Sequence, residues 1–538
     1  MIQMKSRLLQ RTSFFVILIA AISVAVLAQQ QQPLQISPSV DRLRQHVSYL
    51  ASDALEGRRT GSPGANDAAH YIAGEFSRLG LRPATQTARA PKTRGEALSR
   101  FLQRFPYVAG VQLGKGNEMA LATEAAATPG NLRVGEDWMP LGLSSNARIE
   151  NARATFVGYG ITVSDLKYDN YATANAAGSI AIALSGTPDG DNAHGQFARY
   201  EDVRWKAIAA RNAGAKALVV VAREENFKDD RLSLLHYDNS GGDVGLAVAG
   251  ISRQALQRVL KMPLSDIEGA LKQQLVTSVR LPNVSVTIAT DIVRQEVAAS
   301  NVIGILEGSD STLKSQYVFF TGHMDHIGTP GSGEGCVARG ADSICNGADD
   351  DGPGTTAVLE TAEAFAQLQP RPKRSLVFMT VSGEERGLWG SQWYSDHPTL
   401  PLANTVADLN TDMVGRNWKD TIAVIGKEHS DLGATLNRIG AAHPELRMTP
   451  IDDIWPQENF YFRSDHYNFA RKGVPILFFF NGTHPDYHEV GDSPDKIDAE
   501  KESRIIKLVF YLGLDIANAP DKPKWNPDSY RRIVRGAN

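Results

Sequence analysis

The 538-residue chain contains only two cysteines, Cys336 and Cys345, which lie close together in a glycine-rich stretch. A disulfide-dense scaffold is therefore excluded. A single disulfide, two free thiols or a metal-binding pair remain, and the missing C-x-x-C spacing makes the metal pair the weakest of these. If the protein is exported, a disulfide is the natural state. In the chain-entropy model a loop this short would gain roughly 2–3 kcal/mol.

Beyond its N-terminus the chain has no apolar run long enough to cross a bilayer. Three basic residues precede an apolar run at 13–27, and Ala28 stands at the expected cut. This pattern is typical of a secretory signal, so we expect a signal peptide at 1–28 and a secreted or periplasmic protein. A membrane anchor is the alternative, but the run is shorter than the about 20 residues of a typical span. No cysteine follows the cut, which leaves a lipoprotein anchor unsupported.

The sequence also lacks a basic block. Without residues 1–28, 53 basic and 60 acidic side chains remain, a formal net charge of −7. A mildly acidic chain of this kind argues against nucleic acid and anionic membranes as partners, so no membrane association is expected after signal cleavage. The sequence makes no prediction of the oligomeric state.

A chain of this length is too long for one ordinary core, so two or three domains are expected. Residues 29–37 are rich in Gln and Pro and predict a disordered linker. We expect the peptide chain to continue as the first part of a main domain at 38–140, an inserted smaller domain at 141–290, the rest of the main domain at 296–520 and a C-terminal tail at 521–538. The inserted segment alternates strands with helices but carries no cluster of His, Cys and acidic residues.

Apolar periodicity from residue 299 onward predicts an α/β fold. The predicted strands lie at 105–113, 154–161, 179–184, 217–221, 301–306, 317–321, 375–381, 405–409 and 474–480. The predicted helices begin near 40 and lie at 68–79, 205–213, 355–368, 388–397, 432–442, 465–471 and 500–517. Residues 82–100 carry little apolar signal and predict a loop.

Two adjacent carboxylates, Glu384 and Glu385, follow the buried strand at 375–381. Leaving either of them unpaired in an apolar core would cost several kcal/mol. One solution is a division of roles, in which one carboxylate binds a cation and the other moves protons. A solvated pair on a loop is the alternative, and the pair alone does not decide between them.

Four further candidate ligands lie after predicted strands or beside glycines: His323, Asp350, Asp412 and His488. Sites in open α/β sheets form beyond the carboxyl ends of the strands, so these groups are expected to meet Glu385 there. Two imidazoles and three carboxylates suit zinc, and their number suits two ions about 3.5–4 Å apart. Taken singly they could be a core histidine, an acidic turn or calcium loop, a helix cap or a surface histidine. Their joint occurrence favours a metal centre.

Six segments together closely resemble the co-catalytic dizinc aminopeptidases of the M28 peptidase family. They are Gly-His-Met-Asp-His at 322–326, Gly-Ala-Asp-Asp-Asp-Gly-Pro-Gly at 347–354, Ser-Gly-Glu-Glu at 382–385, Asn-Thr-Asp-Met-Val-Gly at 410–415, Ser-Asp-His at 464–466 and Tyr-His at 487–488. Residues 50–58 resemble the opening of these enzymes, and the inserted segment resembles their protease-associated (PA) domain. The resemblance covers nearly the whole mature chain, and it implies an α/β fold with a mixed, mostly parallel central sheet flanked by helices.

The resemblance assigns the ligands of two zinc ions as His323 and Asp412 for one, Glu385 and His488 for the other, and Asp350 bridging both. It also implies a cis peptide between Asp350 and Asp351. The triple Asp leaves Asp349 as a weaker alternative for the bridge. Pro353 departs from the family, which more often has a small residue there, and we draw nothing from that change.

The implied activity is the removal of N-terminal residues from peptides with a free N-terminus. Glu384 would be the general base for a metal-bridging water, and Tyr487 would steady the oxyanion. Asp325, two residues past His323, is placed to accept the second imidazole N–H. One alternative is a single-zinc acyltransferase like the glutaminyl cyclases, which zinc stoichiometry would separate. Another is a non-catalytic binding protein of the same fold, against which the intact ligand set counts.

Overall fold

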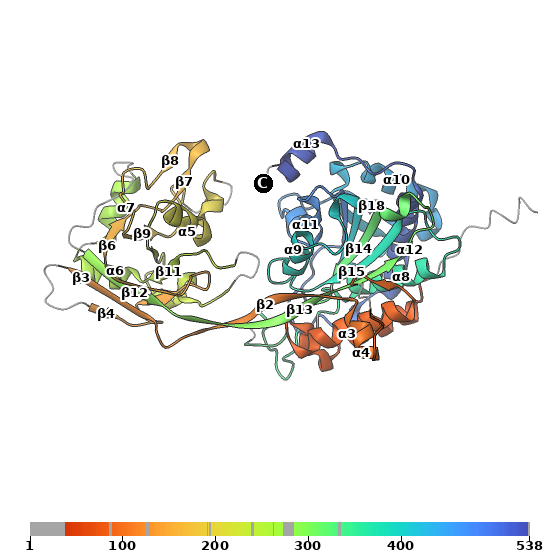
Figure 1. Cartoon of the computed structure of the whole chain (residues 1–538), viewed down its shortest axis with the longest axis horizontal. Coiled ribbons are helices and arrows are strands. Elements are labelled where there is room, and N and C mark those ends of the chain that lie inside the picture. The colour runs from red at the N-terminus through yellow and green to blue at the C-terminus, as the bar shows by residue number, and fades with distance from the viewer. Residues whose placement is uncertain are drawn as a thin grey trace, which may run out of the picture.

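The computed structural model describes residues 38–535, except 86–88, 124–129, 191, 193–194, 238–241, 262, 273–283 and 332–334. The expected signal peptide and linker lie outside these residues. Two lobes are joined by the antiparallel strands β2 (Leu102–Leu113) and β13 (Ile292–Leu306), which run from one lobe to the other (Figure 1). The smaller lobe contains the described residues between 114 and 291, and the larger lobe contains the other described residues.

The larger lobe is built on a nine-stranded sheet in the order β1-β13-β15-β14-β16-β19-β17-β18, with β2 paired to β13. Strands β15, β14, β16 and β19 at its centre are parallel, and antiparallel pairs flank them, which confirms the predicted mixed sheet with a parallel centre. The other strands of this sheet are β1 (Arg82–Pro83), β14 (Tyr317–His323), β15 (Ser375–Val381), β16 (Thr405–Asp412), β17 (Thr421–Ile425), β18 (Thr449–Ile451) and β19 (Ile476–Phe480).

Helices cover both faces of this sheet, which explains why its central strands are continuous apolar runs. Alternate residues of β15 point to opposite faces, with Leu376 and Phe378 in one core cluster and Val377 and Met379 in another. The helices of this lobe are α2 (Val40–Leu50), α3 (Pro63–Arg78), α4 (Arg94–Ser99), α8 (Gly352–Gln367), α9 (Trp389–Asp396), α10 (Leu432–Ala442), α11 (His466–Ala470), α12 (Ala499–Asn518) and α13 (Pro527–Tyr530).

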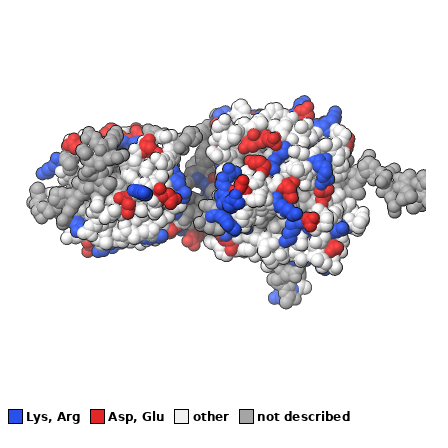
Figure 2. All heavy atoms as spheres, turned by 90° about the horizontal axis from the view of Figure 1, so that it is seen from above, with Lys and Arg blue, Asp and Glu red and all other residues white. Residues whose placement is uncertain are grey.

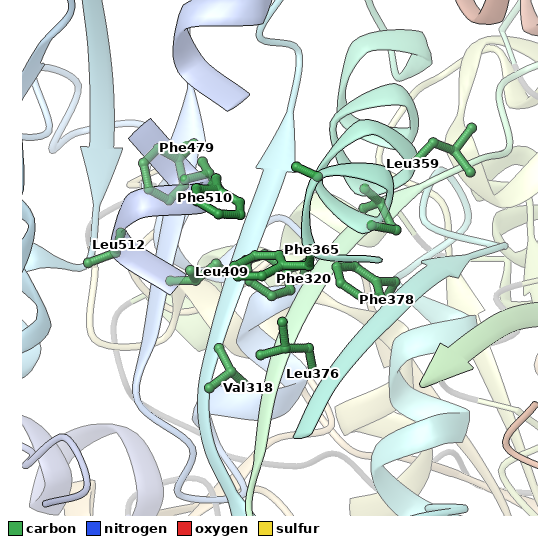
Figure 3. Packing of buried hydrophobic residues seen from close by; sticks show 14 of the residues in the cluster. Val318, Phe320, Leu359, Phe365, Leu376, Phe378, Leu409, Phe479, Phe510 and Leu512 are labelled. Carbon is green, nitrogen blue, oxygen red and sulfur yellow. The ribbon is translucent and has the colours of Figure 1, made fainter. Parts of the chain in front are cut away.

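The first core cluster combines aliphatic side chains with aromatic rings between the sheet, α8 and α12 (Figure 3). Phe320 stacks on Phe378, and Phe365 packs against Phe510 with ring centres 4.2 Å apart. Gly513 lets α12 approach the sheet, since a Cβ there would lie 2.4 Å from the ring of Phe320. Helix α8 is fixed tightly against the strands, and its first residues come directly after the candidate ligand Asp350.

The smaller lobe has its own eight-stranded sheet, in the order β4-β3-β12-β6-β9-β10-β11-β5. This sheet begins at Glu118, earlier than the expected start of the inserted domain at residue 141, because the segments at 118–140 pair with strands of the second sheet. Its strands are β3 (Glu118–Thr123), β4 (Gly130–Leu132), β5 (Trp138–Pro140), β6 (Ala147–Phe156), β9 (Ile180–Leu184), β10 (Ala217–Val221), β11 (Ala247–Ile251) and β12 (Val284–Thr290). The lobe also has the pair β7 (Thr162–Val163) and β8 (Tyr168–Asp169) and the helices α5 (Val203–Asn212), α6 (Arg253–Leu260) and α7 (Leu264–Lys272).

Several predicted boundaries differ from the structure for local reasons. The strand expected at 154–161 ends at Phe156, because Gly158 and Gly160 take left-handed φ angles of 57° and 69°. The loop expected at 82–100 contains α4, capped by the Thr93 side chain. The expected tail is part of the fold, since it forms α13 and buries Ile533 in the second core cluster.

Acidic and basic side chains are interspersed on the face of the larger lobe shown in Figure 2.

Among the helices that the structure describes, none combines the length and apolarity that crossing a membrane requires.

Candidate metal centre

The carboxyl ends of parallel strands position the candidate ligands. His323 is the last residue of β14 and Asp412 the last of β16, while Glu385 comes after β15 and His488 after β19. Since these four strands are parallel neighbours, their ends meet at one edge of the sheet. Asp350 is brought to the same edge by the loop before α8.

The structure brings the five predicted ligands together around the carboxylate of Asp350. On one side, His323 Nε2 lies 3.2 Å from Asp350 Oδ1 and 3.6 Å from Asp412 Oδ1. On the other, His488 Nε2 lies 3.2 Å from Asp350 Oδ2 and 3.0 Å from Glu385 Oε2. The two oxygens of Asp350 thus face two different groups of donors.

These spacings match a pair of metal ions. Two donor atoms bound to one tetrahedral zinc at about 2.0–2.2 Å lie roughly 3.3–3.6 Å apart. The four distances around Asp350 fall within a few tenths of an ångström of that range. Glu385 Oε1 and His488 Nε2 are buried and have no hydrogen-bond partner among the described atoms. The donor set therefore fits two zinc ions, one on each side of Asp350.

The triple Asp divides into three roles. Asp349 lies outside the donor group, because its Oδ1 accepts the Gly415 N–H at 2.8 Å and its Oδ2 lies 3.2 Å from His484 Nε2. Asp351 caps α8 by accepting the Gly354 N–H, and it also accepts the backbone N–H groups of His323 and Met413. The peptide between Asp350 and Asp351 is cis, as the resemblance implies.

Hydrogen bonds to neighbouring groups orient the ligands. Ser464 donates to Asp412 Oδ2 at 2.9 Å, which leaves Oδ1 facing His323. His323 Nδ1 is 3.2 Å from the backbone carbonyl of Asp325 and 3.8 Å from its carboxylate. Asp325 is thus the nearby residue that we expected, but its backbone carbonyl is closer to the imidazole than its carboxylate is. The Asp325 carboxylate instead accepts from the Thr60 hydroxyl and the Glu384 N–H.

Two charged groups that support the centre were not predicted as functional. Asp492 accepts the N–H groups of both Asp349 and Asp350. Arg58 is fully buried and donates to four backbone carbonyls, among them those of Asn346 and Gly347 in the loop that carries Asp350. Arg58 ends the segment at 50–58 and Asp492 lies shortly after His488, but nothing in their residue type indicated where they would bond.

The centre concentrates buried negative charge. The aspartates with at most 7% of their surface exposed here are Asp325, Asp349, Asp350, Asp351, Asp412, Asp465 and Asp492. Burial by itself would lower the pKa of His323, but the carboxylates of Glu384 and Asp412 raise it well above its ordinary value. So many buried carboxylates are costly unless positive charge compensates them, and bound cations would supply that charge.

Glu384 and Tyr487 line a narrow recess beside the donor group, with a cavity volume of about 40 Å³. Burial raises the pKa of Glu384 well above its usual range, and the adjacent Glu385 adds to this while His323 opposes it. The ring of Tyr487 stacks on that of His488 with centres 3.9 Å apart. Phe460, Phe478 and Phe480 form the apolar wall of the recess.

One histidine beside the centre was missed altogether. His326, three residues after His323, is fully buried, and its Nδ1 lies 2.7 Å from Glu385 Oε1. With Asp350 and Glu385 it forms a second group able to hold a metal ion. The segment 322–326 contains both histidines. Because His323 alone was sufficient to account for that segment as a metal-binding motif, no role was assigned to His326.

Cys336 and Cys345 form a disulfide, as expected. Both cysteines pack with Ile327 and Val490, so the disulfide contacts the segment that carries His488. Disulfides of this kind are typical of oxidising compartments.

Residues 301–513 match the profile of Peptidase family M28, and this segment contains the whole donor set. A probable zinc metalloprotease of Pyrenophora tritici-repentis is 26% identical over 269 residues, which are 42% of this chain and 53% of that protein. A probable leucine aminopeptidase of Arthroderma benhamiae is 30% identical over 210 residues, 35% of this chain and 56% of that protein. The chain thus spans about half the length of the curated relatives it matches.

The fold resembles that of an aminopeptidase from Aneurinibacillus sp. strain AM-1, with a TM-score of 0.53 and 20% sequence identity. The comparison covers 91% of this chain and 97% of the other. At this identity the likeness establishes the fold, and the predicted mixed α/β architecture is confirmed.

Proposed function

We propose that the protein is a zinc-dependent aminopeptidase that removes N-terminal residues from peptides in the periplasm or outside the cell. The observation that carries the proposal is the position of Asp350, whose two carboxylate oxygens face two separate donor groups beside Glu384. The match of residues 301–513 to Peptidase family M28 supports the same activity. The disulfide and the signal-like N-terminus support export.

The proposed zinc ligands are the side chains whose donor atoms face one another around Asp350. His323 and Asp412 would hold one zinc, Glu385 and His488 would hold the other, and Asp350 would contribute to both. Zinc ions held by these residues would supply Lewis acidity and would lower the pKa of a water molecule. The buried carboxylates around them keep the net charge of the centre low, which favours retention of the cations.

Glu384 acts as the general base. Its carboxylate takes a proton from the attacking water and passes it to the leaving amine. The raised pKa of this group in the protein alone favours proton uptake, and positive charge at the neighbouring ligands restores the carboxylate form. Tyr487 shares the recess with Glu384 and donates its phenol to the developing oxyanion.

Substrate selection depends on the walls of the recess. A protonated N-terminal amine is attracted by the acidic groups around Asp412, and a narrow recess closed by Phe460 and Phe480 limits binding to the end of a peptide. The smaller lobe corresponds to the PA domain and contributes no residue to the proposed catalytic machinery.

The substitution Glu384→Gln tests the assigned base. We expect hydrolysis of aminoacyl-anilide substrates to fall by roughly 10²–10⁴-fold while zinc content stays unchanged, because the amide keeps the size of the side chain but cannot accept the proton. The exposed Glu428 provides a matched control as Glu428→Gln. Equal turnover by Glu384→Gln and the wild type would refute the assignment.

Zinc stoichiometry tests the metal pair. Two zinc ions per active chain agree with the proposal. Full activity with a single tightly bound zinc would instead favour an acyltransferase of the glutaminyl-cyclase kind.

A further inference from the structure

We propose that His326 is an additional nitrogen ligand of the second metal ion, the one assigned to Glu385 and His488. The proposal rests on the proposed function only through the metal pair. It gives this ion two imidazoles and two carboxylates, whereas the ion at His323 keeps one imidazole and two carboxylates.

The first observation is that His326 makes no aligned hydrogen bond to the described residues. The side chain is fully buried, yet neither ring nitrogen has a hydrogen-bond partner among the described atoms. A buried polar group without a partner is costly, and such groups in native structures usually meet water, an ion or another ligand. An ion at this position would give the lone pair of Nδ1 a partner in place of the missing hydrogen bond.

The second observation is where Nδ1 points. It lies 2.7 Å from Glu385 Oε1 and 3.8 Å from Asp350 Oδ2. Although 2.7 Å would suit a hydrogen bond, neither Nδ1 nor Oε1 has a partner with hydrogen-bond alignment. Two close acceptors that do not bond each other can both face a common cation. The three residues accordingly form one of the two groups in the described chain that could hold a metal.

The third observation is the relation of His326 to His488. Their ring centres are 5.6 Å apart and the planes are inclined by 75°. Two imidazoles bound to one zinc at about 2.0–2.1 Å have ring centres within roughly 6.5 Å of each other. His326 is therefore near enough to share an ion with His488, from the buried side of the centre.

The fourth observation is that the backbone is shaped around the ring. Gly347 has a left-handed φ of 62°, and a Cβ there would lie 2.4 Å from Cγ of His326. Only glycine leaves room for the ring at this point, since any side chain would displace it. The loop that brings Asp350 to the centre therefore also holds His326 against it.

The test compares wild type with His326→Ala and His326→Asn by zinc titration against a competing chelator and by the visible absorption of the cobalt-loaded protein. Asparagine retains an amide near the place of Nδ1, so it preserves a hydrogen bond but is a poor metal ligand. We expect both variants to bind one ion as the wild type does and the other at least about 10–100-fold more weakly. The cobalt spectrum of the second site should change in both variants, because its coordination changes.

Two results would overturn the proposal. If both variants bind both ions with wild-type affinity and an unchanged cobalt spectrum, His326 is not a ligand. If only His326→Ala binds more weakly while His326→Asn keeps the wild-type affinity and spectrum, His326 positions Glu385 through a hydrogen bond instead. His429→Ala, which alters a buried histidine that faces the Ser529 hydroxyl, is the matched control for nonspecific effects.

Zinc-edge X-ray absorption of the wild-type protein gives a measurement that does not depend on a variant folding. Three imidazoles shared between two zinc ions support the proposal, and two imidazoles contradict it. These readouts need no substrate. A wild type that binds both ions but hydrolyses no peptide would therefore refute the proposed function and leave the assignment of His326 intact.

Discussion

The two lobes of the protein share an architecture but differ in the residues at the ends of their strands. In each, parallel strands at the centre of a mixed sheet are buried on both faces. The strand ends of the larger lobe carry His323, Glu385 and Asp412. In the smaller lobe, Ser185 and Ala222 come after β9 and β10, and both candidate metal-binding groups of the described residues belong to the larger lobe. Strand topology makes a site possible, and the residues at the strand ends decide whether one exists.

The lobes also differ in how they treat buried charge. The larger lobe leaves donor atoms of Glu385 and His488 without protein partners among the described residues. The smaller lobe buries Lys206 completely, but its ammonium group donates to the carbonyls of Tyr159 at 2.6 Å and Gly186 at 2.7 Å. A buried charge that the protein itself satisfies serves the fold, whereas converging donors without partners indicate a ligand. The cavity of about 760 Å³ beside α5 is the larger of the two cavities described. In its described lining the buried hydroxyl of Tyr171 lacks a hydrogen-bond partner, but no second such group converges with it.

The largest expected effect comes from Asp350→Asn. Asparagine has nearly the same size but no charge, so both ions lose a ligand at once. We expect zinc content to fall at both positions and hydrolysis of aminoacyl-anilides to drop by more than about 10³-fold, since the chemistry depends on the metal pair. Elemental analysis and turnover measure the two effects.

The matched control for Asp350 lies after β9 in the smaller lobe. Asp189 comes after a parallel strand as the ligands do, but its carboxylate accepts from the Thr187 hydroxyl and the Phe197 N–H. Asp189→Asn should leave metal content and turnover unchanged. Zinc loss in Asp189→Asn, or retention of both ions in Asp350→Asn, would remove the distinction between the two lobes.

A smaller effect is expected in the pH dependence of the free energy of unfolding of the smaller lobe. Burial lowers the pKa of Lys206 to about 7, while the unfolded chain keeps the ordinary value of 10.5. Between these values the unfolded state binds a proton that the folded state does not, so the free energy of unfolding rises with pH. The rise from about pH 7 to 10 should be on the order of a few kcal/mol.

Lys206→Met should flatten this rise, whereas Lys216→Met, which alters an exposed lysine of the same lobe, should not. Urea unfolding at several pH values, monitored by pulse labelling of peptides from β9 and β10, measures the difference in pH dependence between the variants. Parallel pH profiles for the wild type and Lys206→Met would mean that Lys206 keeps its charge in the folded lobe.

The main sheet was predictable because its strands are buried on both faces and are therefore continuous apolar runs, as at 375–381. The smaller lobe was harder, since its sheet combines segments far apart in sequence. The short strands β4 and β5 have no periodicity of their own and are defined only by pairing with β3 and β11. No local pattern could therefore place the start of that sheet at Glu118.

The five candidate ligands were predictable because each comes after a strand or stands among glycines in a recognisable segment. The groups that hold them were not. Arg58 bonds to backbone carbonyls, and Asp492 fixes the loop of Asp350, so their roles depend on tertiary proximity. For the same reason the sequence pointed to the Asp325 carboxylate, whereas the nearer atom to His323 is the backbone carbonyl.

The smallest effect on the metal centre is expected from removing the smaller lobe altogether. Leu113 and Ile292 are directly paired where β2 and β13 leave the larger lobe, so an Asn-Gly turn can join them as a hairpin in place of residues 114–291. No candidate ligand lies in the removed segment, and both core clusters of the larger lobe remain. We expect the shortened protein to bind both ions, with turnover of a small aminoacyl-anilide changed by less than roughly tenfold, or about 1.4 kcal/mol. A version with residues 114–291 intact and a point change Leu113→Asn controls for disturbance of the ribbon itself. If the shortened protein folds but fails to retain zinc, the smaller lobe contributes to the centre through the ribbon, and the separation of fold from chemistry between the two lobes is wrong.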